Sequence, residues 1–218
     1  MAHDETTGIS QAIVLDWIRT CARLIATQRD YLTELDAAIG DADHGANLDR
    51  GFQAALGRLP SVVDKDVGTI LKTVGMTLVS TVGGASGPLY GTFFLQLGSS
   101  TVGKQDLSPG EWVAAMKAGV DGVVARGKAN LGDKTMIDAL LPAVDALRSA
   151  VLAGASLAVA TENAAAAAER GADATVPLVA RKGRASYLGD RSAGHRDPGA
   201  TSSTLLFQAL VESVGRHR

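Results

Sequence analysis

The chain has 218 residues, of which 46% are hydrophobic and 20% charged, so it is long enough to form one domain with a full hydrophobic core. Its net charge of −2 gives no support for a nucleic-acid or anionic-membrane partner. A single cysteine, Cys21, excludes an internal disulfide, and no apolar run is long enough to span a bilayer. The N-terminus lacks a secretory signal, and we expect a cytoplasmic protein.

Apolar residues recur at spacings of three and four along most of the chain, which predicts helices. We expect residues 1–8 to be flexible and residues 9–218 to form one domain. The predicted helices cover 9–38, 46–59, 64–82, 89–98, 109–126, 135–152, 156–180 and 198–214. Residues 89–98 are apolar nearly all round and could also form a strand, but their helical neighbours favour a helix. No segment shows the alternation typical of a half-buried strand.

Proline and capping residues refine these boundaries. Ser108, Pro109 and Glu111 form the start of a capping box. Pro142 predicts a kink inside its helix, and Pro177 is a second disturbance near the end of the next one. The result is an all-α protein with eight antiparallel helices in a single up-and-down bundle.

Alternate connections of such a bundle lie at the same end. The connections at residues 36–47, 83–88, 127–135 and 181–199 therefore come together, and they contain most of the glycine-rich and charged motifs. The connections at the other end, near Pro60, Gly103 and Gly154, carry nothing comparable. This alternation of connections between the two ends, which we call helix parity, predicts that the glycine-rich and charged motifs gather at one end of the bundle.

The first of these connections is strongly acidic. Asp36, Asp41, Asp43 and His44 lie within nine residues around a glycine turn. Closely spaced carboxylates repel one another unless they bind a cation, although a solvated acidic loop is the simpler interpretation. The spacing does not match an EF-hand loop, and His44 is the only nearby nitrogen ligand, which disfavours zinc. Magnesium, which combines a few carboxylates with phosphate oxygens, fits better.

The other connections favour an anion. Residues 45–47 begin a helix, where free backbone N–H groups and the helix dipole attract negative charge. The turn at 83–87 is glycine-rich but is not a Walker A loop, and it could equally be a tight helix–helix turn. Arg184 lies between two small residues in a basic loop, and Asp197 precedes the last helix as an N-cap. Together these features indicate a magnesium–nucleotide site that lacks a P-loop.

Phosphoryl transfer needs mainly positioning and charge neutralisation, which bound metals and Arg184 could supply. No residue stands out as a general base, and His44 and His195 are candidates only by residue type. A kinase subunit is therefore the leading hypothesis. A stand-alone metal-dependent phosphohydrolase and a non-catalytic nucleotide sensor that binds a transcriptional regulator remain alternatives.

Four long motifs resemble the nucleotide-binding L subunit of dihydroxyacetone kinases. They are IGDADHGANLDRGF (39–52), GMTLVSTVGGASGPLYGTFF (75–94), DGVVARGKANLGDKTM (121–136) and ARKGRASYLGDRSAGHRDPGATS (180–202). The resemblance covers nearly the whole chain. It implies an antiparallel eight-helix barrel with the nucleotide at one end, in agreement with the parity argument.

The resemblance also implies roles for individual residues. Two Mg2+ ions would bind to Asp36, Asp41 and Asp43. The implied contacts with ADP or ATP are His44, Gly45, Ala46, Asn47, Ala85, Ser86, Gly127, Met136, Arg184, Asp197, Pro198 and Gly199. Met136 would contact the adenine, whereas its position alone suggests a core residue.

Finally, the resemblance implies partners. In this family the ketose is held covalently by a histidine of a separate K subunit, which would explain the absence of a base here. Fused family members exchange ADP for ATP, whereas stand-alone L subunits keep ADP as a cofactor that a phosphocarrier M subunit rephosphorylates. With no K domain in the chain, we expect the second kind, with an ATP-exchanging kinase for a related small ketose as the alternative.

Overall fold

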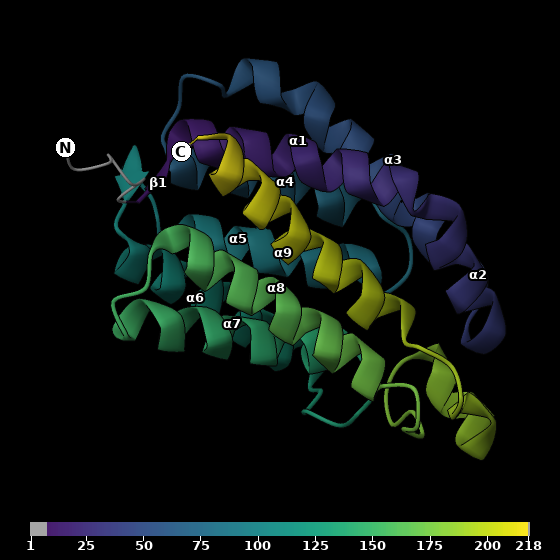
Figure 1. Cartoon of the computed structure of the whole chain (residues 1–218). Helices are drawn as coiled ribbons and strands as arrows, with labels where there is room; N and C mark the ends of the chain where they lie inside the picture. The colour runs from purple at the N-terminus through teal and green to yellow at the C-terminus, as the bar shows by residue number, and fades with distance from the viewer. Residues whose placement is uncertain (1–7, 218) are drawn as a thin grey trace.

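The computed structural model describes residues 8–217, and nine α-helices within this range form a closed ring (Figure 1). The helices are α1 (Gln11–Thr27), α2 (Arg29–Ile39), α3 (His44–Arg58), α4 (Val67–Thr81), α5 (Ser86–Ser99), α6 (Pro109–Gly127), α7 (Ile137–Leu152), α8 (Leu157–Ala174) and α9 (Pro198–Arg216). The shorter elements are the strands β1 (Ile9–Ser10) and β2 (Asp106–Leu107) and the 3-10 helices η1 (Leu59–Ser61) and η2 (Arg184–Ser192). The predicted all-α, single-domain antiparallel architecture is confirmed.

The expected first helix, 9–38, is in fact two helices. They meet at Gln28, whose ψ of 6° departs from helical geometry. The backbone hydrogen bonds continue across this residue, because Gln28 donates to Leu24 and Leu32 donates to Gln28, each at 2.9 Å. The Thr27 hydroxyl also bonds the carbonyl of Arg23, a side-chain contact that often bends helices. The chain therefore bends without reversing, and α2 continues toward the same end as α1 (Figure 1), so the parity argument still holds.

Each helix packs against its neighbours in chain order, and α1 closes the ring by packing against both α3 and α9. The interior is one continuous apolar core with a cluster of aromatic rings at its centre. Trp17 lies 5.5 Å from Phe94 and 5.4 Å from Trp112, measured between ring centroids. The Trp17 indole also donates a 2.7 Å hydrogen bond to the carbonyl of Leu206, which fixes α1 against α9. Cys21 is buried in this core.

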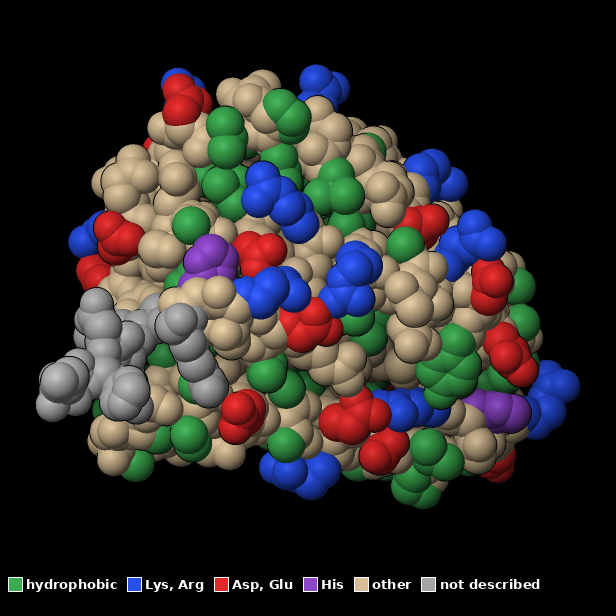
Figure 2. Space-filling view, turned by 45° about the horizontal axis from the view of Figure 1, so that its top comes forward, with side chains coloured by type: hydrophobic (Ala, Val, Ile, Leu, Met, Phe, Trp, Pro, Cys, Tyr) green, Lys and Arg blue, Asp and Glu red, His purple; other side chains and the backbone are tan. Residues whose placement is uncertain are grey.

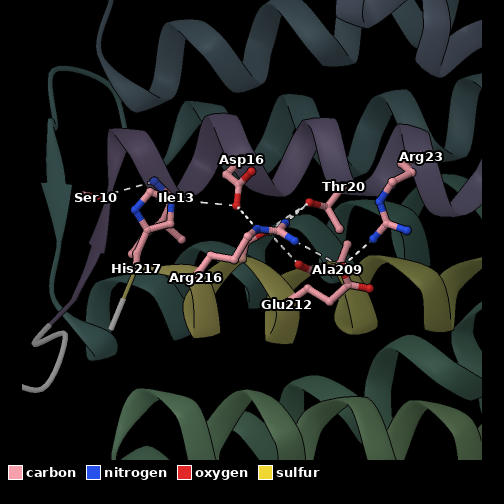
Figure 3. Close-up of polar contacts among 10 residues, drawn as sticks. Ser10, Ile13, Asp16, Thr20, Arg23, Ala209, Glu212, Arg216 and His217 are labelled. Carbon is pink, nitrogen blue, oxygen red and sulfur yellow. Dashed lines mark hydrogen bonds and ion pairs between the residues drawn. The ribbon is translucent and has the colours of Figure 1, made fainter.

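Polar contacts reinforce the α1–α9 seam on its outer side (Figure 3). The Arg216 guanidinium donates to Asp16 at 2.8 Å and also bonds Thr20 and Glu212. Glu212 in turn pairs with Arg23 on α1. Exposed ion pairs contribute little individually, but a connected network of this kind holds the first and last helices in register.

Close helix packing depends on small residues between α4 and α5. A Cβ atom on Gly91 would lie 2.9 Å from the carbonyl oxygen of Gly75, so the two helices approach too closely for a side chain there. This contact explains how a chain that is rich in glycine and poor in aromatic residues builds its ring. None of the helices among the described residues combines the length and apolar character needed to cross a lipid bilayer.

Three further boundaries differ from the sequence predictions. Ile9 pairs with Leu107 and Ser10 with Asp106 in a two-residue antiparallel ladder, which is too short to show alternation. Gly8, which was predicted to be flexible, packs against Leu107 and so belongs to the folded part. The other residues of that prediction, 1–7, lie outside the described range. Helix α8 ends at Ala174 instead of near residue 180, and the expected loop 181–197 contains η2.

Pro142 lies inside α7, as predicted from its place in the helical pattern. The face of the molecule in Figure 2 shows basic and acidic side chains interspersed, without an extended area of one sign. This mixture is what nearly equal numbers of acidic and basic residues, 23 and 21, lead one to expect.

Candidate functional site

Four connections converge at one end of the ring around a cavity of about 390 Å³. They are the connections α2–α3, α4–α5, α6–α7 and α8–α9, which are the four that helix parity brings together. The volume lies within the range typical of small-molecule sites. The sequence-predicted residues that line the cavity are Asp36, Asp41, Asp43, His44, Ala85, Ser86, Gly127, Met136, Arg184, Asp197, Pro198 and Gly199.

Three carboxylates form a compact acidic group at the cavity. One oxygen from each of Asp36, Asp41 and Asp43 lies within 4.8 Å of the others. Asp36 is buried in the last turn of α2 and accepts hydrogen bonds from the amides of Asp43, at 2.9 Å, and His44, at 3.2 Å. A Cβ atom on Gly40 would lie 2.0 Å from the Asp36 carboxylate, so this tight turn requires glycine. The sequence prediction that these side chains gather is confirmed.

The backbone and charge around this group fit a bound cation. Ala42, between two of the aspartates, has a φ of 60°, a left-handed conformation that is strained for a residue with a side chain. The Arg184 guanidinium lies 2.9 Å from a carboxylate oxygen of Asp41, so a positive group already faces the cluster. Three carboxylates that converge on one point also provide the hard oxygen ligands that Mg2+ prefers. Metal binding by Asp36, Asp41 and Asp43 stays a prediction that their geometry supports.

Three helix N-termini face the cavity beside its polar groups, in addition to that of α7, which begins at Ile137 in the apolar wall. Helix α3 begins at His44, α5 at Ser86 and α9 at Pro198, and each of these residues lines the cavity wall. Asp197 caps α9 by accepting a 2.7 Å hydrogen bond from the amide of Ala200. Unpaired amides and aligned dipoles at helix N-termini favour negative groups such as phosphates. The cavity thus combines an acidic cluster with three positive helix ends.

His44 is enclosed on both sides of its ring. Its Nδ1 lies 3.1 Å from the hydroxyl of Ser86, and its Nε2 lies 2.8 Å from the hydroxyl of Ser202. Burial lowers the pKa of His44, against the opposing effect of nearby Asp36 and Asp43. Burial therefore favours the neutral form of the ring.

Sequence reasoning did not single out Lys134, which also lines the cavity. Its side chain is only 1% exposed, and its ammonium donates to the carbonyls of Thr175, at 2.7 Å, and His195. Burial lowers the pKa of Lys134. Burial also raises the pKa of Asp197 to about 7, although the Ala200 amide and the charge of Lys134 both act against this rise. The sequence signals were the place of Lys134 beside the glycine turn at 132 and inside the motif at 121–136.

Part of the remaining cavity wall is apolar. It is formed by Ile39, Leu89, Val123, Ala129, Met136 and Ile137. Most of these residues follow the same helical spacing as core residues, so their spacing did not distinguish them from the core. A cavity that combines an apolar wall with an acidic cluster suits a ligand with a flat ring at one end and phosphates at the other.

Several candidates do not line the cavity. Gly45, Ala46 and Asn47 lie in the first turn of α3 behind His44, and the Asn47 side chain accepts a 2.6 Å hydrogen bond from Arg50. Their nucleotide contacts stay predictions. His195 is an exposed loop residue, and its carbonyl serves Lys134.

Comparison with known proteins agrees with this arrangement. The sequence profile of the DAK2 domain matches residues 38–212. The chain is 49% identical to the PEP-dependent dihydroxyacetone kinase, ADP-binding subunit DhaL, of Escherichia coli K12, over 94% of this chain and 97% of the relative. It is 45% identical to the corresponding subunit of a second PEP-dependent dihydroxyacetone kinase, from Listeria innocua, over 88% and 89% of the two chains.

Solved structures show the same fold. The dihydroxyacetone kinase of C. freundii superimposes with a TM-score of 0.70 and 25% identity, over 98% of this chain and 37% of that one. Its complex with AMP-PNP and Mg2+ gives the same TM-score at 27% identity, over 93% of this chain and 34% of that one. The domain match and the two curated relatives together show that this chain belongs to the DAK2-domain family.

Proposed function

We propose that the chain is the nucleotide-binding subunit of a dihydroxyacetone kinase, and that it presents a magnesium–nucleotide to a ketose held on another subunit. The observation that carries this proposal is the convergence of three carboxylates and three helix N-termini on one cavity. The PEP-dependent dihydroxyacetone kinase subunits that the chain resembles are named as ADP-binding, which supports the assignment.

Each group of residues has a distinct task in this proposal. Asp36, Asp41 and Asp43 hold two Mg2+ ions, because three converging carboxylates carry more charge than one such ion offsets. When bound, the metal ions neutralise negative charge on the phosphates. The first turns of α3, α5 and α9 bind phosphate oxygens through their amides, and Met136 contacts the adenine ring in the apolar part of the cavity.

Arg184 is the proposed catalytic residue. In the nucleotide complex its guanidinium would leave Asp41 to the metal and bind the phosphoryl group in transfer, where it offsets the developing charge. The ring of His44 is enclosed by two hydroxyl groups, and no other histidine lines the cavity among the described residues. In this proposal the proton of the attacking hydroxyl is accepted by the partner that holds the ketose.

The partner in this proposal is a K subunit that binds dihydroxyacetone covalently. ADP remains on the chain and is rephosphorylated by a phosphocarrier M subunit of the phosphotransferase system. The Lactococcus lactis relative, 40% identical, is named as PTS-dependent, which supports this route. We also propose that the protein acts in the cytoplasm and that a transcriptional regulator is an additional partner.

A second candidate is an ATP-exchanging kinase for a related small ketose. The chain is 36% identical to an L-erythrulose 1-kinase of Mycolicibacterium smegmatis, over 91% of this chain and 35% of that protein. The higher identities to PEP-dependent subunits, up to 49%, favour the phosphocarrier-fed route.

Reconstitution tests this function directly. The purified chain is combined with K and M subunits, the general phosphotransferase proteins, phosphoenolpyruvate and dihydroxyacetone, and dihydroxyacetone phosphate is measured. We expect product only when all components are present, and product without the M subunit when ATP is supplied would favour the exchanging kinase. Release of phosphate from ATP by the chain alone, without K subunit, would instead indicate a metal-dependent hydrolase.

A further inference from the structure

A chain of hydrogen bonds runs from the cavity wall, where Ser86, His44 and Tyr90 lie, into the protein interior. It runs from the Ser86 hydroxyl to Nδ1 of His44, at 3.1 Å, and from Nε2 of His44 to the Ser202 hydroxyl, at 2.8 Å. Ser202 then bonds the Tyr90 hydroxyl at 2.6 Å. Ser202 is fully buried and Tyr90 is 1% exposed, so bulk water does not replace these partners.

This chain of hydrogen bonds connects the three helix N-termini at the cavity. Ser86 is the first residue of α5 and His44 the first of α3, while Ser202 lies one turn into α9. The His44 ring therefore lies between α5 and α9 and is held by a hydroxyl from each. A shift of this ring would move Ser86, which faces the cavity, relative to the start of α9.

Burying a polar group away from water destabilises the folded protein unless the group is hydrogen-bonded. The Ser202 hydroxyl has three neighbours at bonding distance, because it also lies 3.1 Å from the carbonyl of Gly199. One donor and two acceptor positions on the hydroxyl can all be filled by these neighbours. Buried networks with every member satisfied fix one arrangement of the groups they contain.

We propose that Ser202 and Tyr90 are positioning residues for nucleotide binding, which act by holding the His44 ring between α5 and α9. Ser202 bonds the imidazole ring of His44 directly, and Tyr90 bonds Ser202. Their effect on the bound phosphates is transmitted through Ser86 and the aligned helix N-termini. This inference rests on the proposed function, since it concerns how the same cavity retains Mg–ADP.

The neighbouring Ser203 offers a matched control. It is also fully buried on α9, bonds the carbonyl of Gly199 at 2.8 Å, and contacts the Tyr90 hydroxyl at 3.1 Å. No contact joins Ser203 to His44 among the described residues. Replacement of Ser202 or Ser203 by alanine removes the same atom from the same helix, and the two variants differ in the bond to the histidine.

The first readout is the dissociation rate of Mg–ADP at a fixed pH. We expect Ser202→Ala to raise this rate at least about tenfold, which corresponds to the loss of one buried hydrogen-bond partner. Tyr90→Phe should raise it about threefold to tenfold, because Ser202 keeps its bond to His44 but loses its own orienting partner. Ser203→Ala should remain within about threefold of the unmodified protein.

The second readout is the ¹⁵N spectrum of the His44 side chain in the nucleotide-free protein. The Nε2 resonance should shift in Ser202→Ala and stay in place in Ser203→Ala. Equal changes in ADP dissociation for the two serine variants, or an unchanged Nε2 resonance in Ser202→Ala, would overturn the proposal. If Ser202→Ala does not fold, an unchanged dissociation rate in Tyr90→Phe overturns it.

These readouts separate this inference from the proposed function. If the unmodified protein binds no Mg–ADP, the proposed function fails, yet the His44 spectrum still reports whether Ser202 holds the ring. If the unmodified protein binds Mg–ADP and the serine variants behave alike, only the positioning role fails.

Discussion

Asp36 and Asp41 illustrate how two carboxylates in one cluster differ at the residue scale. Asp36 is buried and bonds two backbone amides, so it holds the α2–α3 turn as well as facing the cavity. Asp41 is exposed and pairs with Arg184. Substitution should therefore separate ligand binding from folding at these two positions.

We expect Asp41→Asn to weaken binding of Mg–ADP by tenfold or more, because it removes one anionic metal ligand. Its melting temperature without nucleotide should change little. Asp36→Ala should both weaken binding and lower stability by about 1–3 kcal/mol, since two amides lose their acceptor. Calorimetric titration and thermal unfolding measure these effects. Mg–ADP affinity that is unchanged in Asp41→Asn would contradict the metal assignment.

Lys134 and Lys128 form a natural pair on the α6–α7 connection. Both have left-handed backbone conformations, with φ of 61° and 48°, but Lys134 is buried and Lys128 is exposed. Lys134→Met should lower the free energy of unfolding by about 1–3 kcal/mol, because the carbonyls of Thr175 and His195 lose a charged donor. Lys128→Met should change it by less than about 0.5 kcal/mol. Equal losses of unfolding free energy in the two variants, measured by urea unfolding, would show that Lys134 does not hold these loops together.

Asp197 gives a prediction about pH. Because burial raises its pKa to about 7 from an ordinary 3.8, the folded protein binds this proton more tightly than the unfolded chain does. The carboxyl therefore destabilises the fold increasingly as pH rises from about 4 to about 7. Asp197→Asn keeps an oxygen to cap α9 and removes the titration.

The free energy of unfolding, unmodified protein minus Asp197→Asn, should accordingly fall between about pH 4 and pH 7 and then level off. Urea unfolding of nucleotide-free protein at several pH values measures this difference. A difference that does not depend on pH would contradict the raised pKa of Asp197.

At the scale of elements, capping signals predicted the starts of α6 and α9 correctly, whereas the end of α8 was misplaced. The capping box at Ser108 is present, with reciprocal bonds between Ser108 and Glu111. A hydrogen bond from Lys104, reinforced by the two donors of Ser108, lowers the pKa of Glu111 to about 2. The expected end of the seventh helix near residue 180 was wrong, because α8 turns at Thr175, whose hydroxyl bonds back to Ala172.

The break between α1 and α2 shows a different limit. Apolar spacing continues through Gln28 and so predicts one helix, whereas a small dihedral change at one residue bends the chain. The core requires this bend because α2 must pack against α3 and α9. Such a requirement comes from tertiary packing and is not visible in local spacing.

The capping box also yields a test at this scale. We expect Ser108→Ala to lower the free energy of unfolding by about 1 kcal/mol, the usual effect of removing a serine N-cap. Helix α6 begins at the end of the ring away from the cavity, so affinity for Mg–ADP should stay within about twofold. Weaker nucleotide binding in this variant would show that the two ends of α6 are energetically coupled.

At the scale of the whole molecule, the order of the helices along the chain is sufficient to locate the site. Parity alone brings residues 36–47, 83–88, 127–135 and 181–199 to one end, and the cavity is lined from all four. The buried polar chain through Tyr90 and Ser202 could not be predicted in this way. It joins helices that are distant in sequence, and its serine and tyrosine follow no spacing that separates them from core positions.

The ring of helices thus holds four connections around one cavity. Ligand binding to the folded state should raise thermal stability by mass action, and removal of divalent cations should reverse that gain. The central claim is that this ligand is an adenine nucleotide, kept on the protein as a cofactor.

The most direct test is to purify the protein without added nucleotide, denature it, and identify what is released by chromatography and mass spectrometry. We expect about one ADP per chain, which resists exchange with isotope-labelled ATP in the presence of Mg2+ and is lost in Asp41→Asn. Full exchange with ATP would contradict the fixed cofactor. Protein that neither releases an adenine nucleotide nor binds one with Mg2+ would contradict the account as a whole.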